Sequence, residues 1–141
     1  MTVLLDTNII IDCLTEREPH FVFSRDVVRK CLDGDVVGFL PTHTANDIFY
    51  IVHKSKPDLP PKDLVEAIVM FFKTLETVNL TVSDIEAASL LTFSDFEDAL
   101  INQCALKIKS DYIITRNVKD FSKSTVKAIT PQVFLKQIIK N

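Results

Sequence analysis

The sequence is poor in glycine, with only Gly34 and Gly38 among its 141 residues. It therefore has no Gly-rich phosphate-binding loop of the G-x-x-x-x-G-K-[ST] or G-x-G-x-x-G type, and it also lacks H-E-x-x-H and G-x-S-x-G. P-loop and dinucleotide-binding proteins, zinc proteases and α/β-hydrolases are thereby excluded. No tract is repeated, low in complexity or linker-like, which predicts one domain over residues 1–141.

Cysteines and long apolar runs are also scarce. Cys13, Cys31 and Cys104 form no C-x-x-C pair and fall in helical patterns, so we expect small buried side chains in a reducing compartment. The longest apolar stretches, such as residues 68–72, are too short to span a bilayer. The run before Asp6 lacks the basic flank of a signal peptide. These features predict a cytoplasmic protein without a membrane partner.

The balance of charge shows no basic excess, because the formal net charge is −3. A protein that only coats nucleic acid usually carries a basic footprint. Carboxylates that bind a metal ion invert the local field, so an acidic nuclease remains physically reasonable. With 47% apolar and 25% charged residues, the composition is that of a globular domain rather than a disordered chain.

Short apolar runs alternate with helical patterns along the chain. Strands are expected over residues 3–5, 36–40, 78–80, 112–114 and 127–129. Capping boxes at Ser83-x-x-Glu86 and Ser94-x-x-Glu97 predict two helix starts, and Thr130 before Pro131 predicts a third. This alternation predicts a three-layer α/β/α sandwich with a mainly parallel sheet of four to five strands.

Four acids stand where a metal site would need them: Asp6, Asp47, Asp98 and Asp120. Asp6 directly follows the first strand, and ligands of open α/β sheets bind outside the carboxyl ends of strands. Asn117 and Asp120 follow the fourth strand, so they are expected at the same edge. Asp47 and Asp98 lie on polar faces of predicted helices.

Each of these residues also has a structural interpretation. Asp6 is a favourable helix N-cap, Asp47 fits a solvated helix surface, and Asn117 can cap a helix with Asp120 three residues later. In the 94–98 segment, Glu97 is explained as the capping-box partner of Ser94, and Asp95 by the helix dipole. Neither the capping box nor the helix dipole explains Asp98, so it is the acid that most needs a functional reason.

Clustered carboxylates suit Mg²⁺ or Mn²⁺, which prefer oxygen ligands. Such an ion with further acids can activate water for in-line attack on phosphorus. The side chains expected to orient the metal ligands or to bind phosphate are those of Thr7, Asn8 and Thr115. We expect Arg116 and Lys119 to contact the phosphate backbone of a nucleic-acid substrate.

Four blocks, taken in order, resemble the PIN domain, in particular the stand-alone VapC-type toxins of toxin–antitoxin pairs. They are VLLDTN (3–8), HTANDI (43–48), DFEDAL (95–100) and YIITRNVKDF (112–121), and they cover nearly the whole chain. The resemblance implies a PIN-like fold and a Mg²⁺- or Mn²⁺-dependent ribonuclease acting on single-stranded RNA. It also implies an antitoxin partner.

The resemblance further implies that Asp6 and Asp98 are the core metal ligands. Asp47 falls where the family usually has Glu, so it is expected as a third metal ligand, and Asp95 lies beside the ligands. The family's last acid commonly follows the threonine of the fourth strand. Here Asn117 holds that place, and Asp120 is the nearest acid and the fourth catalytic candidate.

Two other functions stay open at this point. The asparagine at 117 motivates a PIN scaffold of weak or absent catalysis that binds RNA or protein. A metal-dependent phosphatase or phospho-acceptor would use Asp6 as nucleophile, although Thr7 and Asn8 follow it instead of a second acid.

The helix expected over residues 64–75 is apolar on two sides. One stripe suffices for the core, formed by Leu64, Ala67, Ile68, Phe71 and Leu75. A second stripe contains Val65, Val69 and Phe72, with Met70 beside it. Deeper burial is the alternative, but we expect this face, with the neighbouring helix that bears Phe49 and Tyr50, to form a homodimer or to receive an antitoxin segment.

Overall fold

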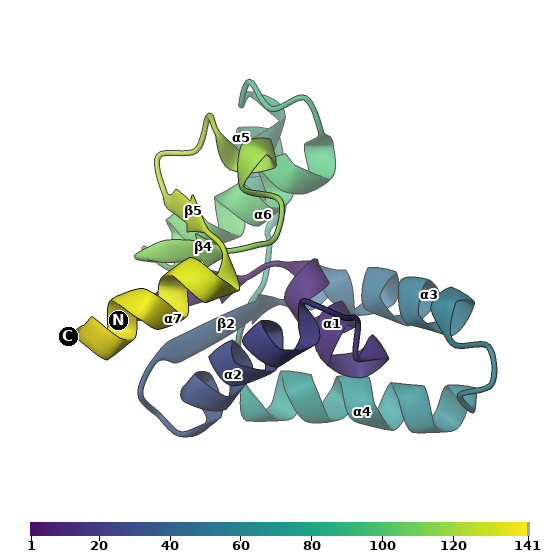
Figure 1. Cartoon of the computed structure of the whole chain (residues 1–141). Helices are drawn as coiled ribbons and strands as arrows, with labels where there is room; N and C mark the ends of the chain where they lie inside the picture. The colour runs from purple at the N-terminus through teal and green to yellow at the C-terminus, as the bar shows by residue number, and fades with distance from the viewer. Residues whose placement is uncertain (141) are drawn as a thin grey trace.

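A computed structural model describes residues 1–140 and contains one five-stranded sheet in the order β3-β2-β1-β4-β5 (Figure 1). All four pairs of neighbouring strands are parallel. The strands are β1 (Thr2–Leu5), β2 (Val37–Pro41), β3 (Glu76–Val78), β4 (Tyr112–Ile114) and β5 (Lys127–Ile129). The predicted parallel sheet of four to five strands is thereby confirmed.

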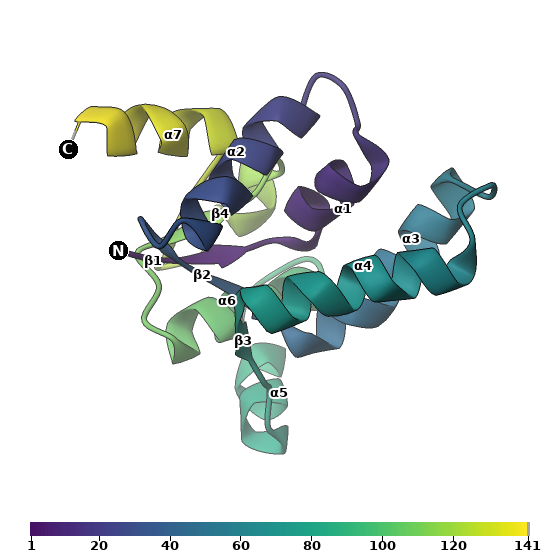
Figure 2. The ribbon, with the colours of Figure 1, turned by 90° about the horizontal axis from the view of Figure 1, so that it is seen from below.

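Helices cover both faces of the sheet, as Figure 2 shows. On one face lie α1 (Thr7–Thr15), α2 (Phe21–Leu32) and α7 (Pro131–Lys140), and on the other α5 (Val82–Ser89) and α6 (Phe96–Lys107). The helices α3 (Ala45–Ser55) and α4 (Pro61–Thr74) pack on each other, and α3 packs on α1. Short 3-10 turns, η1 (Thr42–Thr44) and η2 (Val118–Phe121), follow β2 and β4. The three-layer α/β/α arrangement is therefore also confirmed.

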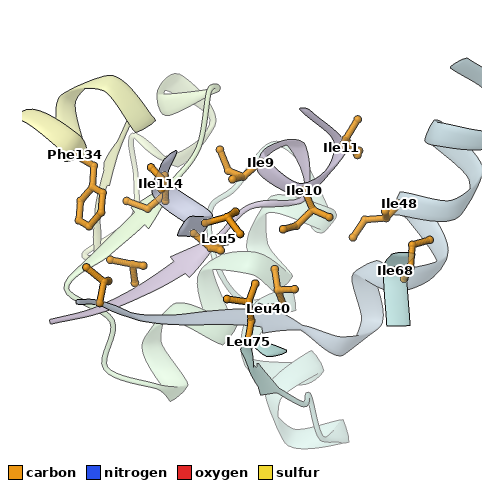
Figure 3. Packing of buried hydrophobic residues seen from close by; sticks show 14 of the residues in the cluster. Leu5, Ile9, Ile10, Ile11, Leu40, Ile48, Ile68, Leu75, Ile114 and Phe134 are labelled. Carbon is orange, nitrogen blue, oxygen red and sulfur yellow. The ribbon is translucent and has the colours of Figure 1, made fainter. Parts of the chain in front are cut away.

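The central strand β1 divides the core into two parts. Successive side chains of a strand point to opposite faces. Val3 and Leu5 accordingly pack with α1, α2, α3, α4 and α7 (Figure 3), whereas Leu4 packs with Ile101 of α6 on the other face. Because both faces are covered, β1 is buried and its strand ends are held rigidly.

Two helix starts differ from the predicted ones. The capping box of α5 is formed by Thr81 and Asp84 instead of Ser83 and Glu86. The N-cap of α6 is Asp95, whose side chain accepts a hydrogen bond from the Glu97 amide, so Ser94 does not cap this helix. In each place several residues able to cap stand close together, and local sequence preference does not choose among them.

Other boundaries lie at or near their predicted positions. The strands β4 and β5 have the predicted limits, and Thr130 precedes α7, where its hydroxyl accepts a bond from the Val133 amide. The strand β3 begins two residues earlier than expected, because α4 ends at Thr74 and the chain extends immediately from Leu75. The three cysteines are free, with Cys104 buried and the other two half-buried. No helix within residues 1–140 is long and apolar enough to cross a membrane.

The apolar surplus of α4 stays at the surface. Leu64 and Ile68 are buried as expected, while the exposed fractions of Val69 and Met70 are 47% and 62%. On the neighbouring helix α3, Tyr50 is 65% exposed. Of the second stripe, Phe72 is half-buried against the core, whereas Val65 and Val69 are exposed, so an exposed apolar surface remains on α3 and α4.

Candidate active site

The acids gather at the carboxyl ends of β1 and β4, the two strands at which the direction of sheet building reverses. Ligands of open α/β sheets bind at such reversal points. Leu5 pairs with Ile114 in the sheet, and the Asp6 amide donates to the Ile114 carbonyl at 3.0 Å. This pairing brings Asp6 beside Thr115, although the two residues are 109 positions apart.

Asp6 is held by three donors in the first turn of α1 and in the loop after β4. Its Oδ1 accepts from the Thr7 amide at 2.8 Å. Its Oδ2 accepts from the Thr115 hydroxyl at 2.7 Å and from the Asn8 side-chain amide at 3.2 Å. The helix-cap interpretation of Asp6 is thus correct in itself, and it is compatible with a site because the same bonds fix the carboxylate in one orientation.

The loop after β4 is fastened to the same residues. The hydroxyl of Thr115 accepts from the Asn117 amide at 3.0 Å, and Asn8 Oδ1 accepts from the Arg116 amide at 3.4 Å. Backbone or side-chain groups of Thr7, Asn8 and Thr115 therefore bond to Asp6, and Asn8 and Thr115 also bond to the loop, while their role in orienting metal ligands stays a prediction. The Thr7 hydroxyl is buried without a hydrogen-bond partner among the described residues.

A pocket of about 250 Å³ joins the N-terminus of α1, the N-terminus of α6 and the loop after β4. Its wall contains most of the predicted site residues, namely Asp6, Thr7, Asn8, Asp95, Asp98, Asn117 and Asp120. Glu97 and the apolar side chains of Ile11 and Ile51 complete it. Residues from three of the four blocks thus meet in this one pocket, which we call the acidic pocket, while the block 43–48 contributes none to its wall.

The charge of the acidic pocket is unbalanced. Burial, followed by the charges of Asp95, Asp120, Asp6 and Glu97, raises the pKa of Asp98 from 3.8 to about 7. Burial also raises the pKa of Asp6, although the bonds from Thr115 and Thr7 act against it. A carboxyl group that resists ionisation near neutral pH indicates a place where a cation would be bound favourably.

Asp47 lies at the margin of this cluster, because it is not part of the pocket wall. It is half-buried in the first turn of α3, and after burial its charge is the next cause of the raised pKa of Glu97. Sequence reasoning missed Glu97 as a site residue by giving it a capping role with Ser94. Three acids within Asp95–Asp98 were the signal that could have found it.

Arg116 has a partner inside the protein. Its Nε donates to Oδ2 of Asp12 at 2.8 Å, and the Ser24 hydroxyl donates to the same oxygen at 2.9 Å. Asp12 is completely buried in α1, and sequence reasoning missed it. The available signal was a single acid within the apolar run of residues 9–14, together with an arginine directly after the fourth strand. Lys119 lies beside the acidic pocket, in a hollow that it shares with Asn117 and Asp120.

The donor atoms of the acidic pocket fit a hard divalent cation. They are carboxylate, amide and hydroxyl oxygens, which Mg²⁺ and Mn²⁺ prefer. Within residues 1–140 no three His, Cys, Asp or Glu side chains are arranged as a ready metal cluster. Mg²⁺ does not require one, since it usually takes one or two carboxylates and completes its shell with water and substrate phosphate. Asp6 and Asp98 are the residues that would hold it, with Asp120 and Asn117 near them.

Comparisons with known proteins agree with this architecture. A search of curated proteins finds no match. VapBC2 from Rickettsia felis, solved with a promoter DNA fragment, is similar in structure with a TM-score of 0.64 and 16% identity, over 92% of this chain and 98% of that one. A toxin–antitoxin complex from Klebsiella pneumoniae gives 0.65 and 21%, over 92% and 97%.

A third similar structure is VapC20 of Mycobacterium tuberculosis, a toxin that cleaves the sarcin–ricin loop, with a TM-score of 0.63 and 12% identity over 79% of this chain and 86% of that one. Identities this low indicate a shared fold. The sequence profile of the PIN domain matches residues 2–119, which include β1, β4 and all the residues of the acidic pocket except Asp120. The chain therefore belongs to the PIN-domain family.

Proposed function

We propose that this protein is a Mg²⁺- or Mn²⁺-dependent ribonuclease that cleaves phosphodiester bonds of single-stranded RNA. The observation that carries the proposal is the convergence of Asp6, Asp98 and Asp120 in the acidic pocket. Burial, followed by the charges of Asp95, Asp120 and Asp6, raises the pKa of Asp98 there to about 7. Membership of the PIN-domain family supports a nuclease activity for this pocket.

The residues in and beside the acidic pocket have different proposed roles. Asp6 and Asp98 would bind the cation. Asp47, the third ligand predicted from the sequence, lies outside the pocket wall and would add negative charge beside Glu97. A bound Mg²⁺ or Mn²⁺ would lower the pKa of water and neutralise phosphate charge. Thr115 and Asn8 keep Asp6 in one orientation through bonds of 2.7 and 3.2 Å. Asp120 and Asn117 would contact the attacking water or the substrate phosphate. Arg116 and Lys119 lie beside them.

We propose further that the protein is the toxin of a type II toxin–antitoxin pair. The Klebsiella pneumoniae complex is a toxin with its antitoxin, and VapC20 is a toxin that cleaves RNA. The exposed apolar surface of α3 and α4, formed by Tyr50, Val65, Val69 and Met70, supports contact with an antitoxin segment or a second copy of the chain.

One feature favours a second function, a PIN scaffold that binds RNA or protein with weak or no catalysis. Asn117 supplies a neutral oxygen where the family commonly has an acid, so the pocket has less charge to balance a cation. The nearest acid, Asp120, is solvent-exposed in η2.

Cleavage of a labelled single-stranded RNA by the purified protein with Mg²⁺ or Mn²⁺ tests the proposal. We expect Asp6→Asn and Asp98→Asn each to reduce the rate at least about 100-fold, and Thr115→Val by roughly 10- to 100-fold, as for loss of a group that orients a ligand. Asp58→Asn, at an exposed position in the α3–α4 loop, is the control for removal of one acidic charge.

Calorimetric titration with Mn²⁺ separates the two functions. A nuclease binds Mn²⁺ in a manner that depends on Asp6 and cleaves RNA. A scaffold shows neither property. Equal cleavage by wild type, Asp6→Asn and Asp98→Asn would show that another protein or another site is responsible.

A further inference from the structure

A second hollow is lined by η2, by the loop that follows it and by the edge strand β5. Its volume is about 530 Å³, within the range of small-ligand sites. Its rim includes Lys119, Ser122, Thr125 and Lys127, and its apolar wall includes Val118 and Val126. We call it the η2–β5 groove.

The groove and the acidic pocket both adjoin a third hollow. This hollow has a volume of about 370 Å³, and its wall includes Asn117, Val118, Lys119 and Asp120. Asn117 and Asp120 also belong to the acidic pocket, and Val118 and Lys119 also belong to the groove. The three hollows thus share the residues of η2, which lie between the acidic pocket and Lys127.

The charge of the surface differs between the β5 side and the α6 side of the acidic pocket. At the N-terminus of α6 the pocket ends in Asp95 and Glu97, which repel a phosphate backbone. Toward β5 the rim carries Lys119 and Lys127. Within residues 1–140 the lysines that form ion pairs are Lys30 and Lys107, so the charges of Lys119 and Lys127 are available to a ligand. A polyanion that reaches the acidic pocket is thus attracted along the groove.

The groove is also fixed relative to the catalytic candidates. The Ser124 hydroxyl on its wall donates to Asn102, which is buried in α6 one turn after Asp98. The same hydroxyl accepts from the Val126 amide at 2.9 Å. These bonds tie the η2–β5 loop to the helix that positions Asp98, so a chain bound in the groove has a defined place relative to the acidic pocket.

We infer that the η2–β5 groove binds the nucleotides of a single-stranded RNA that flank the phosphate to be cut. Lys119 and Lys127 contact backbone phosphates, Ser122 and Thr125 face the ribose and phosphate oxygens, and bases lie against Val118 and Val126. This combination of cationic rim and apolar wall suits sequence-tolerant binding of single strands. The inference rests on the proposed function, because it names the path of that substrate.

Binding of a fluorescein-labelled RNA decamer, measured by anisotropy in EDTA, tests the groove without cleavage. We expect Lys127→Glu to weaken binding about tenfold and Lys127→Ala to lower the salt dependence, the slope of log K against log salt, by roughly 0.7, as for loss of one phosphate contact. Lys62→Glu, which makes the same charge change at the exposed start of α4, is the matched control and leaves binding unchanged.

Cleavage with Mn²⁺ supplies the second measurement. The loss of kcat/KM in Lys127→Glu is expected to be large for the decamer and small for a dinucleotide, which cannot reach the groove from the acidic pocket. Equal affinity of wild type and both Lys127 variants for the decamer would overturn the proposed RNA-binding role of the groove. Binding that depends on Lys127 without any cleavage would overturn the proposed nuclease and keep the groove. A wild type that neither binds the decamer in EDTA nor cleaves it with Mn²⁺ would overturn both.

Discussion

Asp12 is completely buried, and its carboxylate is compensated by the Arg116 guanidinium and the Ser24 hydroxyl. Removing one partner of a buried ion pair leaves the other charge without compensation. Here that other charge belongs to the residue next to Thr115, which bonds directly to Asp6. One side chain of α1 thus fixes the loop that completes the acidic pocket.

We expect Asp12→Ala to lower the free energy of unfolding by about 3 kcal/mol, because Arg116 and Ser24 both lose their partner. Asp12→Asn is expected to cost less, since an amide oxygen still accepts from both donors. The control is Asp26→Ala, which removes an exposed pair with Arg25 at 3.0 Å and is expected to cost less than about 1 kcal/mol. Urea denaturation measures all three, and equal losses in Asp12→Ala and Asp26→Ala would contradict the structural role.

Asp98 gives the metal-free protein a pH-dependent stability. Its pKa is about 7 in the fold and 3.8 as the ordinary value, so the folded chain holds the proton more tightly between these values. Stability therefore falls as the pH rises from about 4 to about 7, because the unfolded state binds fewer protons in that window. Asp6 and Glu97, whose pKa values are also raised by burial, act in the same direction.

The Asp98→Asn variant removes the part of that pH dependence that is due to Asp98. In EDTA we expect its Tm to exceed that of wild type at pH 8 and to approach it at pH 4, whereas Asp58→Asn shows no such trend. Thermal unfolding followed by circular dichroism at the two pH values is the measurement. A Tm difference between Asp98→Asn and wild type that is the same at both pH values would exclude this account.

The residues of the site could be predicted from the sequence where position alone determines them. Asp6 and Asp120 follow strands, and Asp98 had no local structural reason for its presence. Glu97 and Asp12 could not be assigned in the same way. The role of Glu97 depends on which neighbour caps α6, and that of Asp12 depends on a contact 104 residues away in sequence. Both are decided by packing that a local pattern does not contain.

Among the elements, the start of α5 shows why boundaries are harder to predict than the elements themselves. Thr81-x-x-Asp84 and Ser83-x-x-Glu86 are overlapping capping boxes, and both satisfy the same pattern. The fold uses the first, in which Asp84 also accepts from the Lys107 amine of α6 at 2.8 Å. A contact between two helices thus selects the cap, while the existence and order of the helices follow from apolar periodicity.

The two candidate capping boxes of α5 predict different effects of substitution on stability. We expect Thr81→Ala to destabilise the protein by about 1 kcal/mol, as for loss of an N-cap, and Ser83→Ala to change stability little. Chemical denaturation of the two variants side by side is sufficient. A larger loss in Ser83→Ala would mean that α5 begins two residues later than described.

At the scale of the whole molecule, the exposed apolar surface of α3 and α4 is the feature that a solitary chain does not need. Val65, Val69 and Met70 lie on α4, opposite the buried Leu64 and Ile68. We expect Val69→Glu to weaken self-association or antitoxin binding, because it places a charge within an apolar contact.

Multi-angle light scattering of wild type and Val69→Glu, alone and with a candidate antitoxin, measures this effect. Val82→Glu is the control, since Val82 is 74% exposed at the start of α5, on the other side of the sheet. A wild type that is monomeric and binds no antitoxin would contradict the proposed interface. Assembly of Val69→Glu equal to that of wild type would do the same.

The pairing of β1 with β4 also sets when the acidic pocket can first exist. Asp6 lies at the start of the chain, and its partner Thr115 follows 109 residues later. Chains are synthesised from the N-terminus, and contacts between distant segments must wait for the later segment. A polypeptide still being translated has Asp6 without Thr115, Asn117 or Asp120 until β4 has emerged. For a chain proposed to cut RNA, this order keeps unfinished copies inactive beside the ribosome and the message that encode them.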